Sequence, residues 1–341
     1  MRRVAVFFAV GMFLVSFAAV ASADEVSVGA SVSYGMDLND PARGSGNSSV
    51  YSGMNANDES FGVDLVQVGV SGSRGDVSYA AAINFGDLAS AADDTDSGDS
   101  AQLSIANIAY DAGGVTVTAG RFGTPIGYEV LEPWGNAHVS RSYGWQAQPI
   151  NHDGVTVSTA VGGADVTLGA VNNFTVADGS NDADDEMGLI GAIGTSLGDW
   201  SVNLSGIVTE ESDTTDITMA NLILSGELAG MPLTVAVNYR ENDATTKTEM
   251  NGVAIYTGTS VGSADLDLRL DFIDDEGITT GGTDTEVWAV TATASWALSD
   301  GVDFRLEYRH DDADDAIFSD DSSGGTDDAL DTVQAQLVWN P

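Results

Sequence analysis

Two kinds of connection alternate along this chain, and their regular order constrains the fold more than any other feature. Short segments of alternating apolar and polar residues are joined first by a long, polar, aspartate-rich connection, then by a turn of a few residues, then by another long connection. This order is typical of outer-membrane β-barrels, in which short turns face the periplasm and long loops face outward. The pattern predicts an all-β protein whose antiparallel strands form a transmembrane barrel.

About sixteen such segments can be distinguished, an even number that places both ends of the barrel on the periplasmic side. Glycine in most of the tight turns supplies the positive φ that short hairpins need. We expect strands at residues 25–36, 59–71, 77–86, 101–111, 115–122, 153–161, 165–174, 186–197, 200–210, 216–228, 232–242, 249–259, 264–273, 285–298, 302–310 and 329–339.

Two strands, 265–272 and 302–309, have apolar residues on one face and ionisable residues on the other. A soluble β-sandwich also alternates in this way, but the aromatic residues favour a membrane barrel. Trp288 and Trp296 lie on the outward face, and at ~3.3 Å per residue with a ~40° tilt they are ~20 Å apart along the membrane normal, close to the ~25 Å apolar band of such barrels. We predict a membrane girdle of Trp200, Trp288, Trp296 and Trp339, with Phe174, Tyr239, Phe272 and Tyr308 near its outer edge.

The two ends and the charge limit compartment and partners. Residues 1–23 read as a signal peptide with a basic start, an apolar stretch and a small-residue cleavage site at Ala23, so residues 24–341 are expected to form the barrel. Lipid and the barrel assembly machinery are then expected partners. With 52 acidic against 11 basic residues, nucleic acid is excluded. The chain has no cysteine, so it has no disulfide and no thiolate metal site.

More than half of the acidic residues fall in the long loops, which predicts a negative outer mouth that enriches cations. Asp94 and Asp96 offer oxygen ligands at alternate positions before Gly98, but no glutamate follows where an EF-hand needs one. Two interpretations remain open, a defined Ca²⁺ site and a solvated surface with loosely bound Ca²⁺ or Mg²⁺. We expect no cofactor and no resident metal.

The third long loop, residues 123–152, differs from the others. It contains three of the six prolines and two of the six tryptophans, and no aspartate. Long ordered loops with large apolar groups are usually functional and need a surface to pack against. In a sixteen-stranded barrel that surface is the inner wall.

This region carries a resemblance to a known family. The runs 120–129 (GRFGTPIGYE), 140–143 (SRSY) and 152–155 (HDGV), with Pro149, resemble the OmpL-like β-barrel porins of Gram-negative bacteria, most closely over about 115–160. The resemblance implies that the third loop folds inward and constricts the channel, and that homotrimers are common. The chain departs from the pattern at its end, because Asn340 and Pro341 follow Trp339 where such barrels usually finish on an aromatic residue.

An inward loop makes five residues candidates for the pore constriction: Glu129, Glu132, His138, Arg141 and His152. Strand parity places a second set on the lumen wall: Arg240, Arg269, Arg305, Arg309, Asp267, Asp271, Asp303 and Glu307. Facing acidic and basic walls would create a transverse field that orients polar solutes. Alternatively, the wall arginines pair with the neighbouring carboxylates and only stiffen the wall. Arg121 has the parity of an outward residue.

The sequence favours a passive porin for small hydrophilic solutes and ions, with a preference for cations. The alternative is a structural or adhesive barrel whose lumen is plugged and whose acidic loops bind Ca²⁺. A hydrolase needs a nucleophile, a base and an orienting acid. The three histidines (His138, His152 and His310) lie in no nucleophile motif, so we expect no enzyme.

Overall fold

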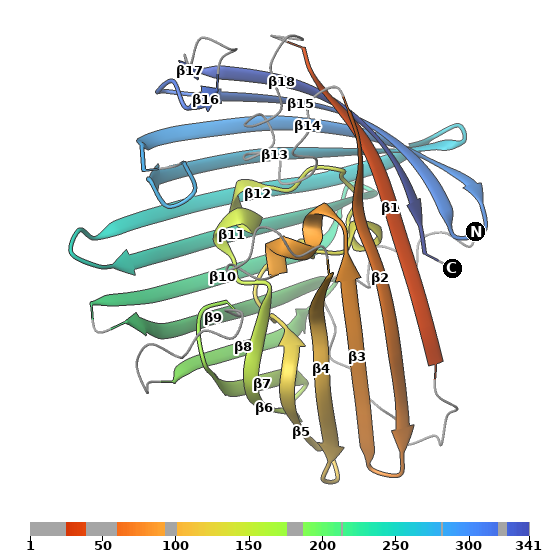
Figure 1. Ribbon diagram of the computed structural model, residues 1–341, viewed down its shortest axis with the longest axis vertical. Helices are drawn as coiled ribbons and strands as arrows, with labels where there is room; N and C mark the ends of the chain where they lie inside the picture. Colours follow the sequence, from red (N-terminus) through yellow and green to blue (C-terminus); the bar gives the residue numbers. More distant parts are fainter. Residues whose placement is uncertain are drawn as a thin grey trace.

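The computed structural model describes residues 25–38, 60–92, 101–175, 187–212, 214–280, 282–319 and 326–340. The predicted signal peptide and the Asp94–Asp96 segment lie outside these residues. Sixteen antiparallel strands form a closed barrel (Figure 1), which confirms the predicted fold class. Each strand pairs with its neighbours in the chain, and β1 closes the ring by pairing with β18 from Ala30–Trp339 to Asp37–Thr332.

The barrel strands lie within a few residues of their predicted positions. They are β1 (Glu25–Asp37), β2 (Ser60–Arg74), β3 (Val77–Phe85), β4 (Ala101–Asp111), β5 (Val115–Gly123), β6 (Asn151–Val161), β7 (Ala164–Val171), β8 (Gly188–Leu197), β9 (Trp200–Ser212), β10 (Thr215–Leu228), β11 (Met231–Asp243), β12 (Thr248–Val261), β13 (Ala264–Glu276), β14 (Asp284–Ser299), β15 (Val302–Ala313) and β18 (Ala329–Trp339). The loops add η1 (Asp87–Ala92), η2 (Pro133–Gly135), α1 (Tyr143–Ala147) and the hairpin β16 (Phe318–Ser319) with β17 (Thr326–Asp327).

The two faces of the wall differ in the way that a membrane barrel requires. On β13, the side chains of Asp267, Arg269 and Asp271 are 6%, 0% and 5% exposed. The apolar residues between them are exposed, Leu268 at 42% and Leu270 at 51%. Since charged groups face inward and apolar groups face outward, the outer face matches lipid and the inner face is polar. Among the described residues, no helix is long and apolar enough to cross a membrane.

Glycine closes several of the short turns, as the hairpin pattern predicted. Gly75 between β2 and β3 has φ 63°, and Gly198 between β8 and β9 has φ 65°. Both lie in the left-handed region, which glycine adopts without strain. Most connections at the opposite end of the barrel are longer, including the loop between β5 and β6, although only two residues separate β9 from β10.

Two residues lie elsewhere than expected. Phe174 was expected in the outer aromatic girdle, but β7 ends at Val171, and Phe174 is buried against Phe122 and Ile126. His152 was expected in the loop, but it belongs to β6. In both cases one end of the strand lies two or three residues from its predicted position. The residue near that end therefore has a different place and different neighbours.

The loop between β5 and β6, residues 124–150, packs against side chains of the inner face. Tyr143 and Ala147 of α1 join a buried cluster with Met250, Ile273 and Phe318. Leu131 and Trp145 join another cluster with Leu65 and Leu88. In Figure 1 this yellow-green segment runs across the middle of the ring of strands. It therefore joins distant parts of the wall to one another.

Candidate pore constriction

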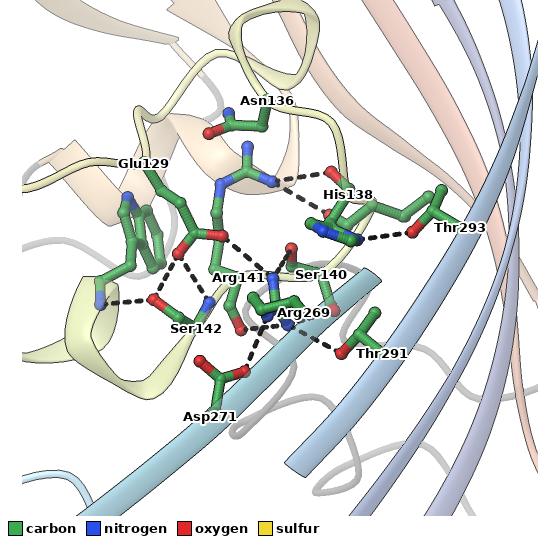
Figure 2. A network of polar contacts seen from close by, with 12 residues as sticks. Glu129, Asn136, His138, Ser140, Arg141, Ser142, Arg269, Asp271, Thr291 and Thr293 are labelled. Carbon is green, nitrogen blue, oxygen red and sulfur yellow. Dashed lines mark hydrogen bonds and ion pairs between the residues drawn. The ribbon is translucent and has the colours of Figure 1, made fainter. Parts of the chain in front are cut away.

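Arg269 of β13 is the centre of a polar network between the wall and the loop (Figure 2). Its Nη1 lies 3.0 Å from Glu129 Oε1 and 2.9 Å from the Ser140 carbonyl oxygen. Its Nη2 donates to Ser140 Oγ and to the Arg141 carbonyl, at 3.0 and 3.1 Å, while Nε donates to Asp271 at 2.7 Å. One fully buried guanidinium thus binds the loop through a carboxylate, a hydroxyl and two carbonyls, an arrangement suited to its rigid fork of donors.

Glu307 of β15 supplies the complementary, negative anchor. Its two carboxylate oxygens accept from the backbone amides of Val139 (2.7 Å) and Ser140 (2.8 Å), and Thr293 Oγ1 donates to it at 2.6 Å. Hydrogen bonds to an ionised carboxylate are among the stronger ones in proteins. The loop is therefore held at the same point by a wall cation and a wall anion.

His138 lies beside this anchor. Its Nδ1 is 2.7 Å from Thr293 Oγ1 and 3.7 Å from Glu307 Oε2. Because Thr293 gives its single hydroxyl proton to Glu307, Nδ1 must carry a proton and donate to Thr293. Complete burial lowers the pKa of His138 below its usual value, although the Glu307 carboxylate opposes the shift. The imidazole is therefore neutral at pH 7.

Arg141 binds other residues of its own loop. Its guanidinium donates to the carbonyls of Val130 (2.9 Å), Leu131 (3.0 Å) and Val139 (3.1 Å), and it lies 5.7 Å from the centre of the Trp145 ring. Burial lowers the pKa of Arg141 to about 10, so the group stays charged at neutral pH. A single cation replaces the backbone hydrogen bonds that an irregular loop lacks.

The other end of the loop core is fixed by carboxylates. Glu129 accepts from the backbone amide and the hydroxyl of Ser142, the amide at 2.7 Å. Glu132 accepts from Gln67 of β2 at 2.9 Å. The Asn136 side chain bonds to the backbone of Val130: its Oδ1 accepts from the Val130 amide, and its Nδ2 donates to the Val130 carbonyl. The loop thus reaches the β2 side of the barrel as well as β13–β15.

Three more wall arginines bind loop carbonyls. Arg309 donates to the Arg141 carbonyl at 2.6 Å, Arg305 to that of Pro133 at 2.9 Å, and Arg240 to that of Ala147 at 2.9 Å. Arg309 also pairs with Asp311 at 2.6 Å, and Tyr143 of α1 donates to the same carboxylate at 2.6 Å. Burial raises the pKa of Tyr143, so its hydroxyl remains a donor.

The structure brings seven of the predicted site residues together in one network. Glu129, His138 and Arg141 meet Arg269, Asp271, Arg309 and Glu307 within one network. His152 lies at the base of the loop, where Nε2 is 3.0 Å from Thr124 Oγ1. Asp267 and Asp303 have no ion pair within the described part of the chain.

Sequence reasoning missed four residues of the network: Thr291, Thr293, Asp311 and Tyr143. Strand parity could have found the first three, because they alternate with outward residues on β14 and β15. Nothing in the sequence separates Tyr143 from the other aromatic residues of the loop.

The four tryptophans of the predicted girdle lie near strand ends. Trp200 begins β9 and Trp339 ends β18, while Trp296 lies near the end of β14 that leads into a short turn. Trp288 lies near the opposite end of β14, is 42% exposed, and donates to Asp312 at 3.0 Å. Arg121, on the outward face of β5, forms a bidentate pair with Asp153 of β6 at 2.9 and 2.8 Å. Within the described residues no group of three or more potential ligands could hold a metal ion.

Comparison with known proteins places the barrel in a family. The family model described as "Putative beta-barrel porin-2, OmpL-like" matches residues 25–338. The chain belongs to the OmpL-like β-barrel porin family. This match confirms the resemblance seen in the loop sequence, extends it over the whole barrel, and indicates an outer-membrane porin. No curated protein matched the chain.

Solved porin structures share the fold of this OmpL-like porin at low sequence identity. An anion-selective porin from Comamonas acidovorans is 12% identical, with a TM-score of 0.66, over 94% of this chain and 100% of that one. OmpF of Salmonella typhi, in complex with daunomycin, is 10% identical (TM-score 0.63, 94% and 98% covered). The outer-membrane channel DcaP of Acinetobacter baumannii is 10% identical (TM-score 0.62, 93% and 97% covered). At such identities the likeness shows the fold alone.

Proposed function

We propose that this porin allows passive diffusion of small hydrophilic solutes and ions and prefers cations. The preference for cations rests on how far the charged side chains of the inner wall are already bound by other groups. Each of the four inner arginines (Arg240, Arg269, Arg305 and Arg309) already binds loop carbonyls or carboxylates. A cation whose donors are occupied attracts a passing anion less than a free one does.

The acidic side chains of the inner wall are bound by partners less completely than the arginines are. Asp165 and Asp303 are on the inner face by strand parity, and no ion pair holds either of them among the described residues. The sequences of the long loops add a large excess of Asp and Glu. Charges within about 8–10 Å of a passing ion act on it at ordinary salt, because that is the Debye length. The field along the path therefore favours K⁺ over Cl⁻.

The loop at residues 124–150 supports the size selection of such a pore. Sixteen strands enclose an aqueous channel unless something fills it. The loop is anchored by polar contacts mainly to the inner faces of β11 and β13–β15, while Ile126 near its start packs with Val171 of β7 and Ile190 of β8. We propose that it narrows the passage to one side of the lumen. On this view Glu129, His138 and Arg141 set the shape of the constriction, while Glu132 contributes charge.

Recording from single channels in a planar bilayer tests the proposal. Refolded residues 24–341 are inserted under a KCl gradient, and the reversal potential is measured. Stable conductance steps with a potential that favours K⁺ are expected. A preference for Cl⁻ would contradict the cation assignment. Silence from a folded and inserted barrel would contradict the open pore and favour the plugged, adhesive alternative, in which the acidic loops bind Ca²⁺ or Mg²⁺.

We also propose the partners that such a pore requires. The apolar outer face suits outer-membrane lipid, and insertion requires the barrel assembly machinery. A homotrimer is proposed by analogy with OmpT of Vibrio cholerae, whose trimer form has a similar fold at 11% identity and a TM-score of 0.59. Cross-linking of the native membranes tests that assembly.

A further inference from the structure

The wall opposite the loop anchors differs in chemistry from the anchoring wall. In the ring of sixteen strands, β6 lies eight positions from β14, so the two strands are diametrically opposed. By strand parity, the inner face of β5–β7 presents Thr116 and Thr118, Thr156 and Ser158, and Thr167. The only ionisable inner residues of these strands are His152, near the outer end, and Asp165, near the periplasmic end. The side of the lumen that the anchors leave free is therefore largely neutral and polar.

The register joins these side chains into one continuous row across seven strands. Thr116 lies opposite Ser158, Ser158 opposite Thr167, and Thr167 opposite Ala192. The row continues to Ser205, Asn221 and Asn238. Six of its seven members carry a hydroxyl or an amide. Since barrel strands are tilted by about 40°, a row at right angles to them runs obliquely along the lumen. We call this row the polar track.

The polar track connects the periplasmic side to the constriction loop. It begins at the second residue of β5, next to the short turn that precedes the strand. It ends at Asn238, which contacts the loop: a Cβ added at Gly144 of α1 would lie 2.2 Å from Asn238 Nδ2. The track therefore runs from half-buried residues near the periplasmic turns to buried residues at the loop.

Neighbouring members of the track bond to one another, yet some of their polar atoms have no partner. Ser158 Oγ and Thr167 Oγ1 are 2.8 Å apart, and Asn221 Nδ2 donates to Asn238 Oδ1 at 2.6 Å. Ser205 Oγ and Asn221 Oδ1 are buried, their side chains 4% and 1% exposed, and neither has a hydrogen-bond partner among the described residues. These two atoms are closed to solvent, so the part of the track that a solute can reach is its half-buried part, Thr116, Ser158 and Thr167.

A second row of hydroxyl groups runs beside the first, nearer the periplasm. Ser201 lies opposite Ser225, and Ser225 opposite Thr234, whose hydroxyl donates to Ser225 Oγ at 3.0 Å. Tyr128 of the loop is half-buried at this level, with its ring 4.5 Å from that of Tyr256, the cross-strand neighbour of Thr234. An aromatic face beside neutral hydroxyl groups can accept the apolar face of a sugar ring and bond its edge.

We propose that the polar track binds uncharged polyhydroxyl solutes, such as short sugars, as they pass through the pore. This inference rests on the proposed function, because it assumes an open passage. The reason is the match between the surface and the solute. A row of donors and acceptors without a charged member can replace the water that a sugar loses.

Block of the K⁺ current by maltotriose tests the track. A saturable decrease in conductance is expected, larger than that caused by a polyethylene glycol of equal hydrodynamic size. Thr167→Val keeps the shape and removes one hydroxyl, so it should weaken the apparent affinity about fivefold, the equivalent of one neutral hydrogen bond. Thr218→Val, on the outward face of β10, is the matched control and should leave the block unchanged.

The outcomes separate the two proposals. If the channel conducts K⁺ but maltotriose blocks no more than the polymer does, the polar track is not a binding surface, although the porin function stands. Wild-type affinity in Thr167→Val also overturns the track. If no variant and no wild-type channel conducts, the proposed function itself fails, and the track fails with it.

Discussion

Arg269 of β13 and Glu129 of the loop form an ion pair with 3.0 Å between Nη1 and Oε1, although 140 residues separate them in the chain. Both side chains are almost completely buried. Removal of one partner from a buried pair leaves an uncompensated charge and typically costs about 3–5 kcal/mol. The pair is therefore a sensitive point of attachment between the wall and the loop.

Arg269→Met should release the loop without opening the barrel, since no interstrand backbone bond is lost. We expect a lower midpoint of thermal unfolding in detergent and a clear rise in open-channel noise, because the loop exchanges between positions. Leu270→Met, on the outward face of the same strand, is the control and should change neither. Quiet channels of unchanged conductance in Arg269→Met would show that the loop is held by other contacts.

The two loop carboxylates should respond differently to neutralisation. Glu129 is buried and balanced by Arg269, whereas Glu132 is partly exposed and, among the described residues, its carboxylate accepts from the neutral Gln67 alone. Glu132→Gln should therefore shift the reversal potential in a KCl gradient toward zero. Glu129→Gln should mainly increase noise and lower stability. If neither substitution changes the ion preference, the charge of this loop does not select ions.

The sequence predicted the barrel well because its signal is repeated in every strand. Alternation on β13 and β15 identified the inward faces of Arg269, Arg305 and Arg309 correctly, since the side-chain period of a strand is two. The same rule applied to a strand end that was misplaced by three residues gave the wrong surroundings for Phe174. The alternation along a strand thus predicts which residues face inward more reliably than it predicts where the strand ends.

Pairing within the candidate site could not be predicted in the same way. The two interpretations of the wall arginines, a free transverse field or pairing with neighbours, both proved incomplete. Arg269 pairs with Asp271 beside it and with Glu129 of the loop, while Arg305 binds the carbonyl of Pro133. Backbone carbonyls of an irregular loop have no sequence signature, so these partners appear only when the loop is placed in three dimensions.

Deletion of residues 125–148 should enlarge the passage. The sixteen strands pair without help from this segment, so the barrel should still fold. The single-channel conductance is expected to rise, and polyethylene glycols that the wild type excludes should enter. Deletion of residues 244–246, in the short loop between β11 and β12, is the control for the effect of shortening a loop. An unchanged conductance after the larger deletion would place the constriction elsewhere.

Acid should loosen the loop through His138. Burial lowers the folded-state pKa of His138 below the ordinary value of about 6.5. Between the folded and unfolded pKa values, the unfolded chain binds more protons, so stability is present above pH 6.5 and is lost as the pH falls. The groups that face the ring are Thr293 of β14, Glu307 of β15, Arg269 of β13, Tyr256 of β12 and Glu129 of the loop. The proximity of Glu307 reduces the effect, and that of Arg269 increases it.

The expected result is a rise in open-channel noise between pH 7.5 and pH 5 for the wild type. His138→Asn retains a donor that can reach Thr293 but has no titratable group, so its noise should vary less over the same range. Thermal unfolding of both proteins at the two pH values gives an independent measure, and the wild type should lose more stability in acid. Equal responses of the two proteins would assign the acid effect to the carboxylates instead, because those groups are the same in both.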